Sequence, residues 1–243
     1  MGYVDYEKNA ALYQRGRALS PAVLDRWGDA VRPYLPSRPL RVGDVGAGTG
    51  IFARAWPTWA VSGVIAVEPT QAMAHQADID DAAVSFVRGV AEDLPLAPAS
   101  IDVVWVSTAL HHFADVDRSL DEFTRVLRPE GRVLVRTYVP DRAGFTFLDE
   151  FPGRSKWVAR YLDEAGLVRL FGRHGFGVVD VVDVAERTET YAQSAEWVSM
   201  MRNADSILTA LDDSDIALGL AALRSNADWV GRMGLTLFVF ERG

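Results

Sequence analysis

The chain has 243 residues, of which 49% are hydrophobic and 24% are charged, and its net charge at pH 7 is −8. This length and composition are typical of one large folded domain. An acidic chain without a basic cluster does not suit a phosphate backbone, so we expect no nucleic acid among its partners. Because the chain has no cysteine, disulfides, thiolate nucleophiles and cysteine-based zinc sites are excluded.

The sequence contains no signal for a membrane or for secretion. No stretch approaches the 18 consecutive apolar residues of a membrane-spanning helix, and the first ten residues, MGYVDYEKNA, lack the apolar centre of a secretory signal. We therefore expect no membrane partner and a cytoplasmic location.

The first element predicted by apolar periodicity is a helix over residues 20–35. Ser20 suits the N-cap and Pro21 the first helical position. Apolar side chains then recur at helical spacing, as at Trp27 and Val31.

From residue 40 onward, strand and helix patterns alternate. Short apolar runs predict strands at 40–45, 63–69, 84–89, 101–108 and 131–139. Helices are predicted after the glycines at 46–50, at 71–77 and at 117–127, before Pro129. The continuous run at 101–108 is typical of a strand that is buried on both faces. This alternation predicts a doubly wound α/β fold, with a parallel sheet and helices on both faces.

Beyond residue 140 the alternation is less regular. We predict an aromatic-rich loop at 141–157, a helix at 162–175, a strand at 176–184, helical structure over 194–231, clearest at 215–230, and a last strand at 234–241. No repeat or linker divides the chain. We therefore expect a single domain over 1–243, with an N-terminal helical cap at 1–38, a central core at 39–139 and a final segment at 140–243.

Three alternating glycines, Gly46, Gly48 and Gly50, follow the first strand. Ligands of doubly wound sheets bind at the carboxyl ends of the strands, and glycines there allow a tight turn and a close approach of the ligand. The dinucleotide fingerprint G-x-G-x-x-G would need a glycine where Ile51 stands. The spacing found here, led by Asp44, resembles that of class I S-adenosylmethionine (SAM) methyltransferases; a glycine-rich turn without a ligand is the alternative.

Two acidic residues farther along the chain fit a nucleoside site. Glu68 ends the second strand about 20 residues beyond the glycines, where a carboxylate can accept hydrogen bonds from both ribose hydroxyls; a solvated acid is the alternative. Met73 suits an adenine face or a helix core equally. The backbone of Ala91 and the carboxylate of Glu92 are candidates for the adenine edge.

Five segments resemble, in order and spacing, the class I SAM-dependent methyltransferases of the small-molecule type, which includes the C-methyltransferases of quinone biosynthesis. They are VGDVGAGTG, AVEPTQAM, GVAEDLPL, DVVWVSTALHHF and EFTRVLRPEGRVLVRTY, within residues 40–138. The resemblance implies a Rossmann-like, seven-stranded sheet with an antiparallel last strand, SAM as cofactor and S-adenosylhomocysteine as product. Two positions depart from the pattern: Val90 stands where relatives often have an acid, and Glu130-Gly131 replaces a pair of glycines.

The resemblance also supplies the candidate site residues. The cofactor-binding set is Asp44, Gly46, Ala47, Gly48, Gly50, Glu68, Pro69, Met73, Ala91, Glu92 and Ser107, joined by Tyr13 and Arg17 of an N-terminal helix that caps the SAM carboxylate in relatives. His111 and His112 are candidates for a catalytic base, a role that suits imidazole near neutral pH, with a positioning role as the alternative. Candidates for the acceptor pocket, which relatives build from residues 140–243, are Tyr138, Phe145, Phe147 and Trp157; packing beneath the loop is the alternative.

These features predict an enzyme that moves a methyl group from SAM to an O, N or C atom of a small molecule, without a metal, as a monomer or homodimer, in bacterial secondary metabolism. The motifs indicate SAM binding and not turnover. A SAM-binding protein that does not methylate, either a cyclase-type enzyme or a binding module, is therefore the main alternative, and a protein side-chain methyltransferase is another. The Asn/Asp-Pro-Pro-aromatic motif of nucleic-acid and protein amide N-methyltransferases is replaced here by STALHHF.

Overall fold

The computed structural model describes residues 5–36, 39–59, 61–77, 80–140, 142 and 144–243. Seven strands form one sheet in the order β3-β2-β1-β4-β5-β7-β6. The strands are β1 (Arg41–Val45), β2 (Gly63–Val67), β3 (Val84–Val87), β4 (Ile101–Ser107), β5 (Leu127–Thr137), β6 (Phe176–Thr190) and β7 (Val230–Arg242). Strand β7 runs antiparallel to both its neighbours, β5 and β6. The predicted seven-stranded sheet with an antiparallel last strand is confirmed.

Alternate side chains of the central strands enter two different hydrophobic cores. On β4, Val103 and Trp105 pack with α2 (Pro21–Val31) and α3 (Ile51–Ala55). Val104 and Val106 pack on the other face with α5 (Val116–Val126) and α7 (Glu164–Arg173). Because helices cover both faces, all four side chains are fully buried, which explains why this strand is a continuous apolar run.

Short polar side chains begin several of the helices. Asp115 accepts a 3.0 Å hydrogen bond from the backbone N–H of Arg118 at the start of α5, and Thr190 forms a capping box with Gln193 at the start of α8 (Tyr191–Met201). Such caps satisfy backbone donors that lack a partner within the helix. Ser20 occupies the predicted N-cap position of α2, but its side chain makes no capping hydrogen bond.

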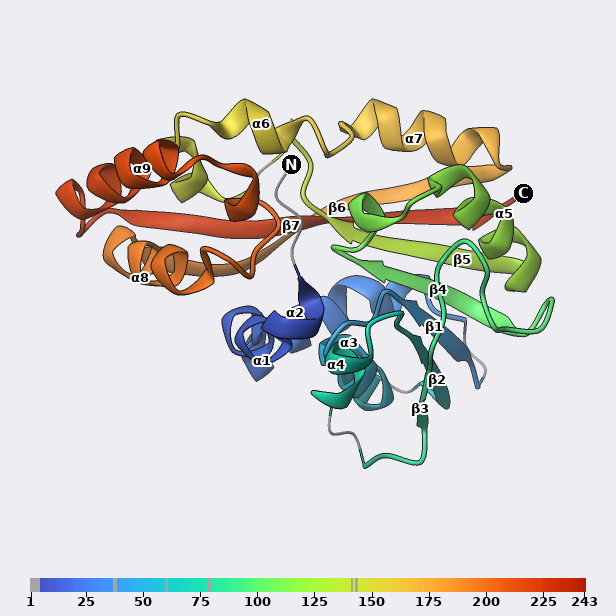
Figure 1. Ribbon diagram of the computed structural model, residues 1–243. Coiled ribbons are helices and arrows are strands. Elements are labelled where there is room, and N and C mark those ends of the chain that lie inside the picture. The colour runs from blue at the N-terminus through green and yellow to red at the C-terminus, as the bar shows by residue number, and fades with distance from the viewer. Residues whose placement is uncertain (1–4, 37–38, 60, 78–79, 141, 143) are drawn as a thin grey trace.

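Strands β6 and β7 are longer than predicted. They pair along their whole length, with Thr190 opposite Val230. The predicted end of the first strand at 184 and the predicted start of the second at 234 are therefore wrong. The helical structure expected over 194–231 is confirmed in part, by α8 and α9 (Asp213–Ser225), but its end is wrong, because residues 230–231 belong to β7. Figure 1 shows this hairpin running beyond the rest of the sheet, with α8 and α9 flanking its far end.

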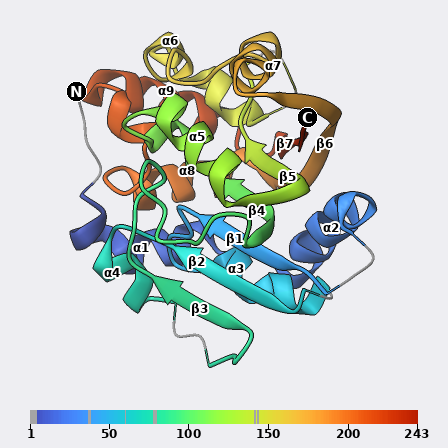
Figure 2. The same cartoon turned by 90° about the vertical axis from the view of Figure 1, so that its right-hand side faces the viewer.

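Helix α1 (Tyr6–Arg17) lies between the central core and the far end of the hairpin. It packs against α4 (Gln71–His75) and α8, and Figure 2 shows α1 and α4 side by side. The expected loop at 141–157 contains the 3-10 helix η4 (Thr146–Glu150) and most of α6 (Arg154–Val158). Positions 1–4, 37–38, 60, 78–79, 141 and 143 of the predicted segments lie outside the described residues. In the described part of the chain, no helix is long and apolar enough to cross a membrane.

Candidate functional site

The turn between β1 and α3 depends on its glycines. Gly46, Gly48 and Gly50 have φ angles of 73°, 56° and 73°, in the left-handed region that other residues disfavour. A Cβ at Gly46 would lie 2.6 Å from that of Ala109. The N–H groups of Gly46 and Ala47 donate to the carbonyl of Val67, at 2.9 and 3.2 Å, which ties the turn to the end of β2. The backbone therefore explains the alternating glycines even without a ligand.

A cavity of about 960 Å³, its open mouth included, lies beside this turn. We call it cavity A. It brings together most of the predicted cofactor residues, and Tyr6 and Thr108 also line it. The predicted residues on its wall are Tyr13, Gly46, Gly48, Glu68, Pro69, Met73, Ala91, Glu92, Ser107 and His112.

Glu68 is held in place by the backbone on both sides of cavity A. Its Oε2 accepts a hydrogen bond from the N–H of Gly48 at 2.8 Å, and its Oε1 accepts one from the N–H of Thr70 at 2.9 Å. Burial raises the pKa of the carboxyl, although these hydrogen bonds oppose the shift. The carboxylate is thus fixed at the predicted ribose position.

Asp44 is 2% exposed at the end of β1, and its Oδ2 has no hydrogen-bond partner in the described part of the chain. Burial, with the charge of Glu68, raises its pKa to about 8. An unsatisfied buried oxygen is costly, so this atom marks a place for a ligand's donor group. Together with the glycine turn and the fixed Glu68, it fits the cofactor that the sequence predicts.

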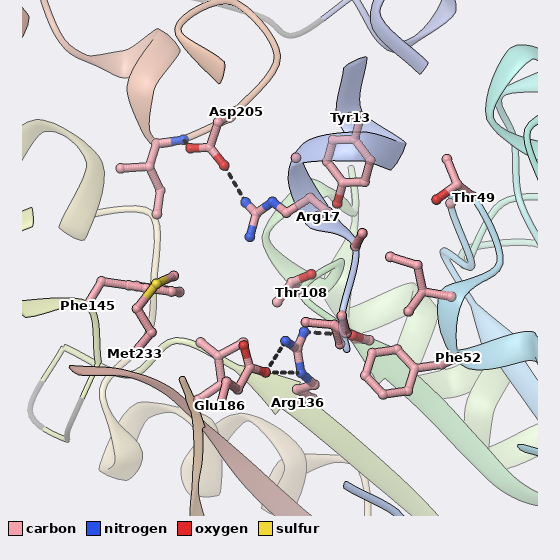
Figure 3. A pocket seen from close by; sticks show the side chains of 18 of the residues that line it. Tyr13, Arg17, Thr49, Phe52, Thr108, Arg136, Phe145, Glu186, Asp205 and Met233 are labelled. Atoms are coloured by element: carbon pink, nitrogen blue, oxygen red, sulfur yellow. Dashed lines mark hydrogen bonds and ion pairs between the residues drawn. The ribbon is translucent and has the colours of Figure 1, made fainter. Parts of the chain in front are cut away.

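A second cavity, of about 910 Å³ with its mouth included, adjoins the first. We call it cavity B. It shares five lining residues with cavity A: Tyr13, Gly46, Gly48, Ser107 and Thr108. Asp44, Ala47 and Arg17 line it as well. Its remaining walls are mainly apolar, and Figure 3 shows the predicted Phe145 beside Met233 on one side and Phe52 on the other. Phe147 also lines it.

One of two buried ion pairs at cavity B joins Arg136 of β5 to Glu186 of β6. Nε and Nη2 of Arg136 both donate to Oε1 of Glu186, and Nε1 of Trp27 donates to the same oxygen at 2.9 Å. Nη1 of Arg136 donates to Ser107 Oγ at 3.0 Å. Figure 3 shows this pair across the pocket from Arg17 and Asp205.

The second pair joins Arg17 of α1 to Asp205, which follows α8. Burial opposes the charge on Arg17, but the Asp205 carboxylate together with the neighbouring tyrosines Tyr13, Tyr161 and Tyr6 outweighs it, and the pKa of the guanidinium is raised. Trp197 Nε1 also donates to the carbonyl of Gly16 at 2.8 Å. Helix α1 is therefore fastened over the junction of the two cavities, where the sequence predicts a cap.

The two predicted histidines occupy different places. His112 lines cavity A, where Tyr6 Oη lies 3.1 Å from its Nε2. Partial burial, with the charge of Arg17, lowers its pKa to about 4. His111 lines neither cavity: its Nε2 lies 3.3 Å from Tyr161 Oη and 3.4 Å from Ser206 Oγ. Burial, with His112 and Arg17, lowers the pKa of His111 well below its ordinary value.

Three other predicted residues, Tyr138, Trp157 and Gly50, line neither cavity. Tyr138 and Trp157 are buried and line neither cavity, so they pack beneath the loop, as the alternative held. Gly50 shapes the turn without reaching either cavity. Glu92 lines cavity A, but its Oε1 accepts hydrogen bonds from the N–H groups of Ala114 and Asp115, at 2.6 and 3.1 Å.

Several site residues have no signal in the sequence. Arg136, Glu186 and Asp205 meet their partners across long separations, which no local pattern reveals. Thr108 lines both cavities with a φ of 50°, a conformation that is rare for a β-branched residue. Among the described residues, no group of three or more His, Asp or Glu is placed to hold a metal ion.

Comparison with known proteins identifies the family. Residues 43–135 match the methyltransferase domain family. The chain is 33% identical over 194 residues to Rv3342, an uncharacterised methyltransferase of Mycobacterium tuberculosis, covering 78% of this chain and 68% of the relative. It is 26% identical over 227 residues to a malonyl-[acyl-carrier protein] O-methyltransferase of Nitrosospira multiformis, covering 83% and 71%. With YcgJ, an uncharacterised methyltransferase of Bacillus subtilis, it shares 32% identity over 154 residues, which is 60% of this chain and only 58% of the relative.

Solved structures show the same fold. The [4+2]-cyclase SpnF matches with a TM-score of 0.70 at 21% identity, covering 98% of this chain and 93% of the other. The crystal structure of YcgJ matches with a TM-score of 0.59 at 19% identity, covering 90% and 98%. The fold and the glycine turn are those of a Rossmann-like methyltransferase. The chain belongs to the class I SAM-dependent methyltransferase family, and its cofactor is SAM.

Proposed function

We propose that this protein transfers the methyl group of SAM to a small molecule held in cavity B. The observation that supports this most directly is the junction of the two cavities at the glycine turn. Gly46, Gly48, Ser107 and Thr108 line both cavities, so a molecule in cavity B lies beside the cofactor site. Methyl transfer needs the two reactants aligned in this way and shielded from water.

The residues of cavity A suit the adenosine part of SAM, and Asp44 and Arg17, which line cavity B near the junction, suit its amino-acid part. We assign Glu68 to the ribose hydroxyls, Met73 and Ala91 to the adenine, Asp44 to a donor of the amino-acid part and Arg17 to its carboxylate. When bound, SAM supplies a methyl group that its sulfonium already activates. The chain's own tasks are then to orient both molecules and to exclude water, and helix α1 with Tyr13 covers the junction for this purpose.

We assign the histidines a positioning role. His112 borders cavity A and is neutral at pH 7, since its pKa is about 4. Its contact with Tyr6 joins α1 to the segment after β4. His111 packs behind it against Tyr161, with ring centres 4.6 Å apart. This placement favours the positioning alternative over a catalytic base in contact with an acceptor in cavity B.

The first experiment is a calorimetric titration of the purified protein with SAM, S-adenosylhomocysteine and NADH, followed by incubation with SAM and candidate acceptors. Binding of the first two ligands but not NADH supports the cofactor site. Acceptor-dependent formation of S-adenosylhomocysteine, detected by mass spectrometry, supports methyl transfer. If the protein binds SAM but forms no S-adenosylhomocysteine with any acceptor that binds in cavity B, the result favours the non-methylating alternative. That alternative is a cyclase-type enzyme or a binding module. The monomer or homodimer state, the cytoplasmic location and the role in secondary metabolism stay predictions.

A further inference from the structure

The charges around cavity B indicate which molecules it can accept. Apart from Asp44, its charged lining residues are ion-paired in the part of the chain that the structure describes: Arg17 with Asp205, Arg136 with Glu186 and Arg187 with Glu189. The walls between these pairs are mainly apolar. Because Arg17 is assigned to the carboxylate of the cofactor, an anionic acceptor would thus find no further unpaired cation to compensate for the loss of its hydration.

Glu186 differs from the other paired carboxylates in how its two oxygens are used. Asp205 and Glu189 employ both oxygens in contacts with protein groups. In Glu186, Oε1 accepts all three hydrogen bonds, whereas Oε2 has no partner among the described residues and is not sealed off from the cavity. Figure 3 shows this second oxygen without an interaction, on the pocket side of the carboxylate. Its lone pairs are available to a donor.

The ion pair holds this oxygen in a fixed position. The guanidinium of Arg136 lies 5.0 Å from the ring centre of Trp27 and 5.2 Å from that of Phe52, and it also donates to Ser107. Glu186 is therefore restrained by Arg136 and Trp27 before an acceptor arrives. A group restrained in this way loses little conformational entropy on binding.

We propose that Glu186 is the acceptor-binding residue of this methyltransferase, and that its Oε2 accepts a hydrogen bond from an O–H or N–H of a neutral, largely apolar acceptor. This inference rests on the proposed function, because it concerns the molecule that occupies cavity B. It assigns the specificity for the acceptor to β6, a strand that carries none of the site residues predicted from the sequence.

Four naphthalene probes of similar size test the proposal by calorimetry on protein saturated with S-adenosylhomocysteine. They are 1-naphthol, 1-methoxynaphthalene, 1-naphthoate and 1-naphthylmethylammonium. We expect 1-naphthol to bind about tenfold or more tightly than its methyl ether, because only the naphthol donates to a charged acceptor. The anion should bind more weakly than 1-naphthol because no unpaired cation compensates it, and the cation because Arg136 already neutralises the charge of Glu186.

Glu186→Gln should reduce the preference for 1-naphthol over its ether to about threefold or less, because a neutral amide oxygen is a weaker acceptor. The matched control is Glu241→Gln. Glu241 makes a similar ion pair, at 2.6 Å, with Arg132, which lies on β5 as Arg136 does. Glu241 lines neither cavity. The control should keep the wild-type preference. The comparison of probes on the wild-type protein remains valid even if Glu186→Gln does not fold.

Four results would overturn the proposal: equal binding of 1-naphthol and its ether, tighter binding of either charged probe, an unchanged preference in folded Glu186→Gln, or no binding of the neutral probes. The prior titration with S-adenosylhomocysteine separates this failure from that of the proposed function. If S-adenosylhomocysteine does not bind, the cofactor assignment fails. If it binds and the probes show no preference, only the role of Glu186 fails.

Discussion

The backbone N–H of Gly48 donates a 2.8 Å hydrogen bond to Oε2 of Glu68. The glycine turn and the acid at the end of β2 are therefore joined directly, although 20 residues separate them in the sequence. Since the N–H of Thr70 holds the other carboxylate oxygen, the acid is oriented before any ligand binds. Such preorganisation lowers the entropic cost of binding.

Glu68→Ala should weaken SAM binding by about 1–3 kcal/mol, the range for hydrogen bonds to a charged group. Calorimetric titration measures the change. Glu122→Ala is the matched control, because Glu122 also accepts a hydrogen bond from a backbone N–H, that of Leu94 at 2.7 Å, and lines neither cavity. Unchanged affinity in Glu68→Ala would place the ribose contact elsewhere.

Gly48→Val should abolish SAM binding, because the side chain would occupy the cavity and demand a positive φ of 56°. The nearest protein atom to a Cβ there, Met73 Cε, is 3.5 Å away, an ordinary contact, so the protein itself does not exclude a side chain. Gly175→Val imposes a similar strain of about 1–2 kcal/mol at a φ of 80°, away from both cavities. Both variants should lose stability in urea, and only the first should lose SAM. A folded Gly48→Val that binds SAM normally contradicts the site.

Asp44 should make SAM binding depend on pH. Its pKa of about 8 leaves the carboxyl mainly protonated at pH 6–7, whereas a bound sulfonium cation favours the ionised form. Affinity should therefore rise from pH 6 towards pH 8, with release of a proton, and should change less in Asp44→Asn. Titrations at several pH values in buffers of different ionisation enthalpy measure both effects. A flat profile in the wild-type protein would count against this.

The same shift affects stability without a ligand. The folded-state pKa of Asp44 lies above the value of about 3.9 expected for an unfolded chain. The folded protein thus binds this proton more tightly, and Asp44 destabilises it increasingly as pH rises from about 4 to 8. Asp44→Asn should gain thermal stability relative to the wild type at pH 8 more than at pH 5. An equal difference at both pH values would show that Asp44 is not the titrating group.

Glu130→Gly should stabilise the protein by up to about 1 kcal/mol. Glu130 is exposed and has a φ of 62°, which costs a residue with a side chain about 1–2 kcal/mol. Glycine removes this strain, but it lowers the free energy of unfolding by roughly 0.5–1 kcal/mol because the unfolded chain gains conformational freedom. Glu130→Ala retains the strain and serves as the control. Urea unfolding that shows the alanine variant to be the more stable one would refute this account.

The sequence predicted the sheet well where both faces are buried. The strands β1, β2 and β4 are short apolar runs, and their positions are confirmed to within a few residues. It failed in the outer part of β6, residues 185–190 (AERTET), because this part is polar and half exposed and has no apolar alternation. The helical pattern of α9 then masked the start of β7.

For the site, the sequence indicated the half that depends on backbone shape. Glycines and strand-end acids have fixed places in the chain, so the residues around cavity A could be named in advance. Aromatic character did not distinguish Phe145, which lines cavity B, from Trp157, which is buried in the core. The pairing of Arg136 with Glu186 spans 50 residues and exists only once β7 lies between β5 and β6.

The long β6–β7 hairpin has a consequence for how proteins of this family diversify. Glu186, Arg187, Met233 and Leu235 all reach cavity B from this hairpin, whereas the glycine turn and Glu68 belong to β1 and β2 at the other side of the sheet. On the proposed function, we expect that exchange of the segment that encodes the hairpin with α8 and α9 changes the acceptor preference and keeps the cofactor site. Laboratory chimeras cut at these boundaries can test this.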